Sequence, residues 1–159
     1  MDPKRSVTNI IVAGLGGQGV LTASDIIADA AFRCGFDVKK SELHGMSQRG
    51  GSVASDVRFG EKVLSPIIPP GEADYLVVLD PGQIENNRGH LRDGGILIAP
   101  DAIEESNLRS KKSLNVALVG VLSARLELPE TAWLEAICAS LPDRLRSANL
   151  QAFALGRAR

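Results

Sequence analysis

Two glycine-rich stretches contain the residues of this chain that could do chemistry. The first follows an apolar run, Asn9–Ala13, and precedes a helix-like pattern that starts at Val20. A strand, then Gly-x-Gly-x-x-Gly, then a helix is the arrangement that binds pyrophosphate, because glycines allow close backbone approach and the helix start supplies free N–H groups. The candidate anion-binding loop therefore consists of Gly14, Gly16, Gly17, Gln18 and Gly19.

Dinucleotide binding has a second requirement, which this chain meets poorly. An acidic residue should follow about 20 positions later, at the end of the next strand, to bind a ribose. Lys39 and Lys40 occupy that place, and Glu42 comes slightly late. The support for an NAD site is therefore weakened. A phosphate or anion site without a dinucleotide, and a glycine turn that only lets helix and sheet pack closely, remain as alternatives for this segment.

The second glycine-rich stretch follows the next predicted strand, so both stretches are expected at the edge of the sheet where ligands of open α/β folds bind. It consists of His44, Gly45, Met46, Ser47, Gln48, Arg49, Gly50, Gly51 and Ser52. Arg49 is the candidate for facing a phosphate or carboxylate, because a guanidinium fork suits both. His44 is a weaker candidate for proton transfer, and a loop histidine that binds a backbone carbonyl is the other interpretation. A polar loop that needs glycines only for turning is the alternative for the whole stretch.

The surrounding elements predict an α/β fold of three layers, with a mostly parallel Rossmann-like sheet, an inserted β-hairpin and a helical C-terminal part. The predicted strands are 9–13, 36–41, 52–59, 75–79 and 96–99. The hairpin is expected to join 52–59 to 63–65 through Gly60–Lys62, and Asp93–Gly95 is expected to form a turn. The predicted helices run from Val20 to a stop at Gly35, from Pro81 onward, and over 116–126, 129–141 and 144–155.

Composition indicates one globular domain. The chain has 159 residues, of which 44% are hydrophobic and 23% charged, and its net charge is -1. This balance argues against nucleic-acid binding and against disorder. The apolar run near the N-terminus breaks at Gly14, so we expect neither a signal peptide nor a membrane span, and a cytoplasmic location. Two cysteines, Cys34 and Cys138, cannot supply the four thiolates of an iron–sulfur cluster, and we expect both to be buried and no metal site.

Taken together, the two stretches resemble the gamma domain of the thiamine-diphosphate-dependent 2-oxoacid:ferredoxin oxidoreductases. Gly-Leu-Gly-Gly-Gln-Gly-Val at 14–20 is similar to that domain's first signature. Lys-Ser-Glu-Leu-His-Gly-Met-Ser-Gln-Arg-Gly-Gly at 40–51 is most similar to the beta subunit of the indolepyruvate branch. The resemblance continues through Ser65-Pro66, Gly71–Asp74, Asn115–Leu118 and Asn149–Gly156, and so covers nearly the whole chain.

The resemblance implies that residues 1–159 form a single gamma-type domain, a subunit without clusters in a heteromeric complex. Such a complex decarboxylates a 2-oxoacid, here an indolepyruvate or other arylpyruvate, to the acyl-coenzyme A and passes electrons to ferredoxin. Thiamine diphosphate, Mg and the iron–sulfur clusters are expected on a large alpha subunit, with no cofactor on this chain alone and no activity when it is isolated. Residues 44–52 would then face the active site. The alternative is a free-standing NAD(P)- or anion-binding Rossmann-like protein.

Overall fold

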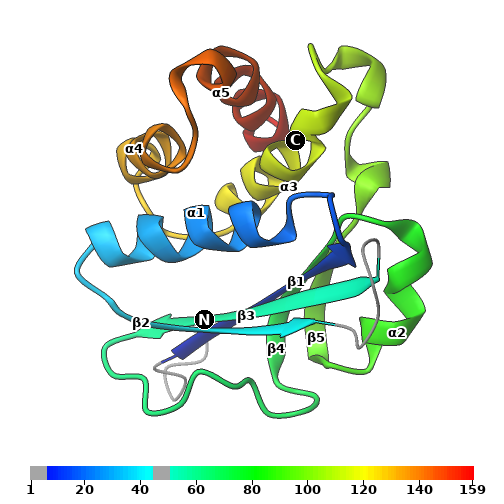
Figure 1. Ribbon diagram of the computed structural model, residues 1–159. Coiled ribbons are helices and arrows are strands. Elements are labelled where there is room, and N and C mark those ends of the chain that lie inside the picture. The colour runs from blue at the N-terminus through cyan, green and yellow to red at the C-terminus, as the bar shows by residue number, and fades with distance from the viewer. Residues whose placement is uncertain (1–6, 45–50) are drawn as a thin grey trace.

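The computed structural model describes residues 7–44 and 51–159, and these residues form a five-stranded sheet covered by helices (Figure 1). The strand order is β2-β3-β1-β4-β5. The strands are β1 (Val7–Leu15), β2 (Asp37–His44), β3 (Ser52–Gly60), β4 (Ala73–Val78) and β5 (Leu91–Ile98). β1, β4 and β5 pair in parallel, whereas β3 lies antiparallel between β1 and β2. Four of the five strands therefore run in one direction, which confirms the mostly parallel sheet.

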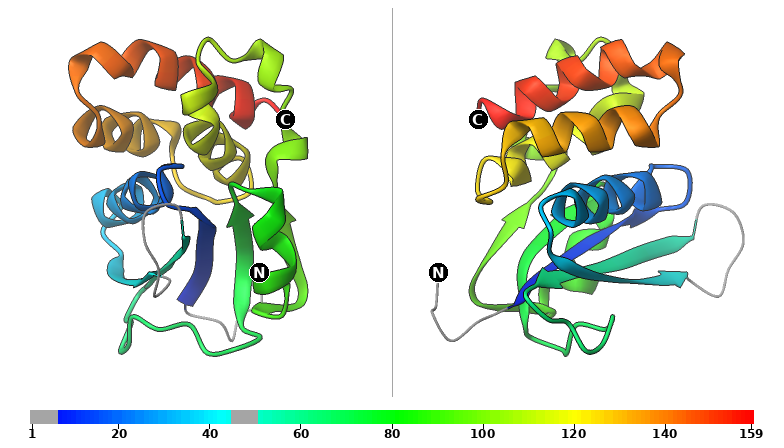
Figure 2. Two further views of the ribbon diagram at one scale, coloured as in Figure 1. Left: turned by 45° about the vertical axis from the view of Figure 1, so that its right-hand side comes forward. Right: turned by 90° about the vertical axis from the view of Figure 1, so that its left-hand side faces the viewer.

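The helices cover the two faces of the sheet unequally. They are α1 (Val20–Arg33), α2 (Ile84–Arg88), α3 (Leu114–Ser123), α4 (Glu130–Ser140) and α5 (Asp143–Arg157). α1 and α3 lie on one face, and α4 and α5 stack outside them (Figures 1 and 2). Among the described residues, the opposite face is covered by α2 and the irregular stretch 61–72, through Ile84 and Ile68. We call this opposite side of the sheet the thinly covered face. The α/β fold class and the helical C-terminal part are confirmed.

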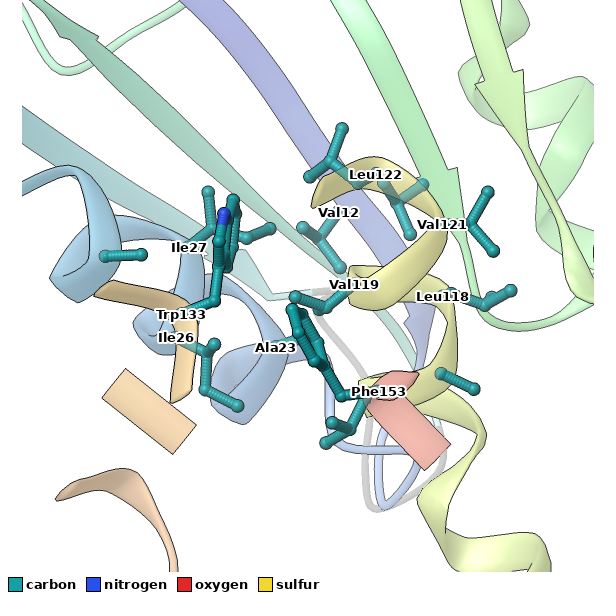
Figure 3. Close-up of a cluster of buried hydrophobic side chains, with 14 of the residues drawn as sticks. Val12, Ala23, Ile26, Ile27, Leu118, Val119, Val121, Leu122, Trp133 and Phe153 are labelled. Carbon is teal, nitrogen blue, oxygen red and sulfur yellow. The ribbon is translucent and has the colours of Figure 1, made fainter. Parts of the chain in front are cut away.

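Alternation along β1 divides the core between these two faces. Ile10 and Val12 pack under the helices, while Ile11 packs on the thinly covered face, as a period of two residues requires. On the helical side, Trp133 and Phe153 are fully buried, with ring centroids 6.2 Å apart (Figure 3). Trp133 is the only tryptophan in the chain, so its fluorescence reports unfolding of this helical layer.

The hairpin predicted from 52–59 to 63–65 is wrong. β3 pairs with β1 along one edge and with β2 along the other, so it has no free edge to offer residues 63–65. The hairpin in this part of the sheet is formed by β2 and β3 instead. The 63–65 stretch is irregular, and the Val63 N–H donates to Asp37 Oδ2 at 2.8 Å.

The turn predicted at Asp93–Gly95 is also wrong, because β5 runs through it. Gly94 has a φ of +78°, and the pairing of β4 with β5 shifts register between Ala73 and Tyr75. The glycines therefore mark a bulge on an edge strand, because glycine readily adopts the positive φ that this bulge needs.

The two cysteines are less buried than the sequence predicts. Cys34 and Cys138 are partly buried rather than fully buried, and burial raises the pKa of the Cys34 thiol.

Asp56 on β3 attaches the 61–72 stretch to the sheet, and it gives the fold a pH dependence. The side chain is almost fully buried, and Asp56 Oδ2 accepts the Ile68 N–H at 3.0 Å. Burial raises the pKa of this carboxyl against the opposing effect of that hydrogen bond. A raised folded-state pKa contributes stability that is complete below the unfolded pKa, about 3.9, and is lost as the pH rises through the folded value.

Asp56→Asn is therefore expected to gain stability relative to the unaltered chain as the pH is raised from 4 to 7. The amide keeps an oxygen that can accept the Ile68 N–H but carries no charge, so its burial has no such pH dependence. Urea unfolding followed by Trp133 fluorescence at several pH values measures the difference. A stability difference that stays constant over this range would contradict the expectation.

Candidate functional site

The first glycine-rich stretch forms a tight turn between β1 and α1. β1 ends at Leu15 and α1 begins at Val20, which confirms the strand–loop–helix arrangement. Gly17 and Gly19 have φ values of +91° and +85°, a conformation that residues with a side chain rarely adopt. The first backbone N–H groups of α1 have no partner within the helix and lie at its positive end. This turn thus presents N–H donors that α1 itself does not use at the carboxyl end of β1.

Gln18 ties the turn to the end of the neighbouring strand. Its Oε1 accepts the Leu15 N–H at 2.7 Å, and its Nε2 donates to Asp80 Oδ2 at 2.9 Å. Asp80 lies two residues after the end of β4, and its Oδ1 accepts the Gly82 N–H at 2.9 Å. A Cβ at Gly14 would lie only 2.8 Å from Gln18 Oε1, so Gly14 makes room for this side chain. The ends of β1 and β4 are therefore bridged by the chain's own side chains.

Asn115 at the start of α3 supports the turn from the other side. Its Nδ2 donates to the Gly19 carbonyl at 3.2 Å, and a Cβ at Gly19 would collide with that amide nitrogen. Asn115 is more than nine-tenths buried, and its Oδ1 has no partner among the described residues. Asn115 and Asp80 were not predicted as site residues. The sequence nevertheless marks both positions, since Asp80 follows the predicted strand 75–79 and Asn115 lies in a segment that resembles the family.

The two glycine-rich stretches meet at one end of the sheet. The Gly16 N–H donates to the Gly51 carbonyl at 2.9 Å, and Leu15 pairs with Ser52 between β1 and β3. The expectation of a common edge is thus confirmed for these residues. His44 is the last residue of β2 and pairs with Val53. The other predicted residues of this stretch, Gly45, Met46, Ser47, Gln48, Arg49 and Gly50, lie outside the described residues. We call the edge formed by residues 14–22, Gly51 and Ser52 the rim.

The sheet order argues against a dinucleotide at the rim. Such sites need an acidic residue at the end of the strand next to β1. Here β3 lies between β1 and β2, so the end of β2 is two strand spacings, about 10 Å, from β1. Glu42 near that end instead accepts a hydrogen bond from Lys40 Nζ at 2.7 Å. The residue that would bind the ribose is therefore displaced by one strand.

Isothermal titration calorimetry of the isolated chain with NAD⁺, NADH, NADP⁺ and NADPH is accordingly expected to show no saturable binding at micromolar concentrations. The physical reason is the intervening β3 together with the Gln18 bridge between the ends of β1 and β4. A dissociation constant in the micromolar range for any of the four would contradict this reading of the rim.

The described residues do not form a set of ligands for a metal ion or an iron–sulfur cluster. Among residues 7–44 and 51–159, no group of three or more His, Cys, Asp or Glu side chains could hold a metal ion. The two cysteines of the chain are fewer than the four thiolates of an all-cysteine cluster. In the same described ranges, no helix is long and apolar enough to cross a membrane.

Known proteins resemble this chain in sequence and, separately, in fold. The sequence signature of the pyruvate ferredoxin/flavodoxin oxidoreductase family matches residues 9–159. Indolepyruvate oxidoreductase subunit IorB of Thermococcus kodakarensis is 44% identical over 89 residues, 56% of this chain and 44% of that protein. The pyruvate/ketoisovalerate oxidoreductases common subunit gamma of the same organism is 35% identical over 120 residues, 72% of this chain and 65% of that protein. The matched part thus spans less than half of the IorB subunit.

Two solved structures share the fold. The gamma subunit of a keto/oxoacid ferredoxin oxidoreductase from Geobacter sulfurreducens has a TM-score of 0.79 at 20% identity, with 96% of this chain and 95% of that chain covered. The 2-oxoglutarate:ferredoxin oxidoreductase of Magnetococcus marinus has a TM-score of 0.80 at 20% identity. It matches 98% of this chain but only 31% of its own, so the same fold forms part of a longer polypeptide there.

Proposed function

The chain belongs to the pyruvate ferredoxin/flavodoxin oxidoreductase family, and we propose that it is the gamma-type subunit of a 2-oxoacid:ferredoxin oxidoreductase. In this proposal, residues 1–159 act as one domain beside a larger subunit that carries thiamine diphosphate, Mg and iron–sulfur clusters. The observation that carries it is the hydrogen bond from Gly16 N–H to the Gly51 carbonyl, which holds both glycine-rich stretches at one rim. A rim built from two loops suits a reaction centre that another polypeptide completes.

In the complex, thiamine diphosphate supplies the carbanion chemistry of decarboxylation. The contribution of this chain is electrostatic and positional. The N–H groups at the start of α1 place positive potential at the rim, where a 2-oxoacid carboxylate or the phosphates of coenzyme A would be stabilised. Gln18, Asp80 and Asn115 keep those donors in place through hydrogen bonds of 2.9 and 3.2 Å. We further propose that Arg49, with Gly50 and Gly51, faces the same anion, and that His44 is the candidate for moving a proton.

Arylpyruvates are the proposed substrate class. Two observations support this choice. The sequence of residues 40–51 resembles that of the indolepyruvate branch, and the chain is 44% identical over 89 residues to an indolepyruvate oxidoreductase subunit. Pyruvate and branched 2-oxoacids are the competing substrates, since a gamma subunit of that specificity is 35% identical to this chain.

Reconstitution tests the proposal. The chain is purified alone and together with a large thiamine-diphosphate-type subunit from the same organism, and reduction of ferredoxin is followed with coenzyme A present. We expect turnover only with both proteins, and faster turnover with indolepyruvate and phenylpyruvate than with pyruvate or 2-oxoglutarate. Complete turnover by the isolated chain, or the absence of any turnover by the pair, would overturn the subunit assignment. Faster turnover with pyruvate would overturn only the substrate class.

A further inference from the structure

Three exposed aliphatic side chains belong to the thinly covered face of the sheet. Leu43, Leu64 and Ile67 are 65%, 86% and 60% exposed. Leu43 pairs with Ala54 of β3, whose side chain packs on the thinly covered face, and side chains opposite one another in a ladder share a face. Leu64 and Ile67 lie in the 61–72 stretch, which runs under the sheet on the side away from α1 (Figure 1).

The 61–72 stretch is held rigidly although it has no regular structure. Arg58 Nη1 donates to the carbonyls of Ser65 and Ile67 at 2.9 and 3.1 Å. Asp56 binds the Ile68 N–H, and Val63 and Ile68 are buried on either side of the exposed pair. Leu64 and Ile67 are therefore presented in a fixed arrangement, so that ordering them costs little on binding.

The exposed side chains at the two ends of this face lie close enough together to belong to one interface. Ala54, which is opposite Leu43, and Arg58, which holds Ile67, are four residues apart on β3, about 13 Å. A standard interface buries about 800 Å² on each partner, more than three side chains supply. They therefore suit anchors within a larger contact better than the whole contact of a self-associating dimer.

The surface between α2 and the hairpin has the chemistry of a polypeptide contact. A groove of about 200 Å³ there is lined by Leu43, Ser52, Ala54 and three amides, Gln83, Asn86 and Asn87. None of the described residues that line it carries a charge. These described residues offer an anion no counter-charge, whereas their amides offer donors and acceptors that match peptide groups.

We propose that the thinly covered face is the surface on which the larger catalytic subunit docks, with Leu43, Leu64 and Ile67 as its apolar anchors. This inference rests on the proposed function and adds the surface through which the two chains bind. The groove shares Ser52 with the rim, so a partner that lies against this face also reaches the rim. Its complementary surface would be apolar at the anchors and uncharged along the groove.

Binding of the large thiamine-diphosphate-type subunit from the same organism, measured by biolayer interferometry, tests the proposal. Leu64→Ser/Ile67→Ser and Leu43→Ser are each expected to raise the dissociation constant at least tenfold. Phe32→Ser is the matched control, because Phe32 is 69% exposed on α1, on the helical side of the sheet. It is expected to change the dissociation constant less than twofold.

Trp133 fluorescence during urea unfolding verifies that the variants fold, and the high exposure of the replaced side chains predicts unchanged midpoints. Binding of the anchor variants as tight as that of the unaltered chain would overturn the docking surface alone. Loss of binding in Phe32→Ser instead would also overturn it. Self-association of the unaltered chain that both anchor variants abolish, seen by sedimentation, would assign the face to a second copy and overturn it as well. An unaltered chain that does not bind the large subunit would overturn the proposed function, and this inference with it.

Discussion

Gly156→Ala is expected to destabilise the fold by about 3 kcal/mol, the upper end of the usual cost of overpacking. A Cβ at Gly156 on α5 would collide with the Ala117 carbonyl oxygen of α3, and one at Gly120 would collide with the Phe153 carbonyl oxygen. Both obstacles are backbone atoms of helices, so no flexible side chain can move aside. The two helices must separate, which opens the core around Trp133 and Phe153.

Urea unfolding followed by Trp133 fluorescence measures this cost, which is a large part of the stability of about 5 to 15 kcal/mol that domains have. Gly89→Ala is the matched control. Gly89 has a φ of -66°, and a Cβ there would meet no atom within 4 Å. Its free energy of unfolding is expected to stay within about 0.5 kcal/mol of that of the unaltered chain, as for most surface changes. Equal midpoints for the two variants would show that α3 and α5 are not packed backbone to backbone.

Gln18→Glu is expected to reduce partner-supported turnover at least tenfold and to cost about 2 kcal/mol of stability, the scale of a lost hydrogen bond to a charged group. The change replaces the Gln18 Nε2 donor with an oxygen facing Asp80 Oδ2, where the atoms are now 2.9 Å apart. Two carboxylates at that distance repel each other, so the turn moves away from β4 and the N–H donors of the rim lose their positions.

The exchange Gln18→Glu/Asp80→Asn is expected to recover most of both losses. A carboxylate at position 18 can still accept the Leu15 N–H, and an amide at position 80 can donate to it while its oxygen accepts the Gly82 N–H. The same turnover assay and urea unfolding measure the recovery. A double variant that is no more active than Gln18→Glu would mean that the bridge between β1 and β4 does not position the rim.

Local pattern predicts the elements of this fold better than their pairing. The change of period at Val20, after an apolar run and glycines, predicts β1, the turn and α1. The strands at 36–41 and 52–59 are equally visible, but only long-range packing places β3 between β1 and β2. The short apolar run at 63–65 has the local pattern of a strand, yet β3 has no edge left for it. Asp93–Gly95 has turn composition, but it lies inside β5 as a bulge between Leu91 and Ile96, which both pair with β4.

The candidate site follows the same division. The glycines of the first turn could be predicted, because positive φ at Gly17 and Gly19 is a local property. The side chains that hold the turn could not be predicted from spacing. Gln18 and Asp80 are 62 residues apart, and Asn115 is 96 residues from Gly19. Only the topology that brings β4 and α3 beside β1 makes these contacts.

Amide hydrogen exchange of the chain, with and without the large subunit, tests most directly whether the rim completes the partner's reaction centre. The account predicts slower exchange in the complex at residues 16–22 and 51–53, where donors at the start of α1 and the Gly16–Gly51 contact form the rim. Slower exchange confined to α4 and α5, with the rim unchanged, would contradict it.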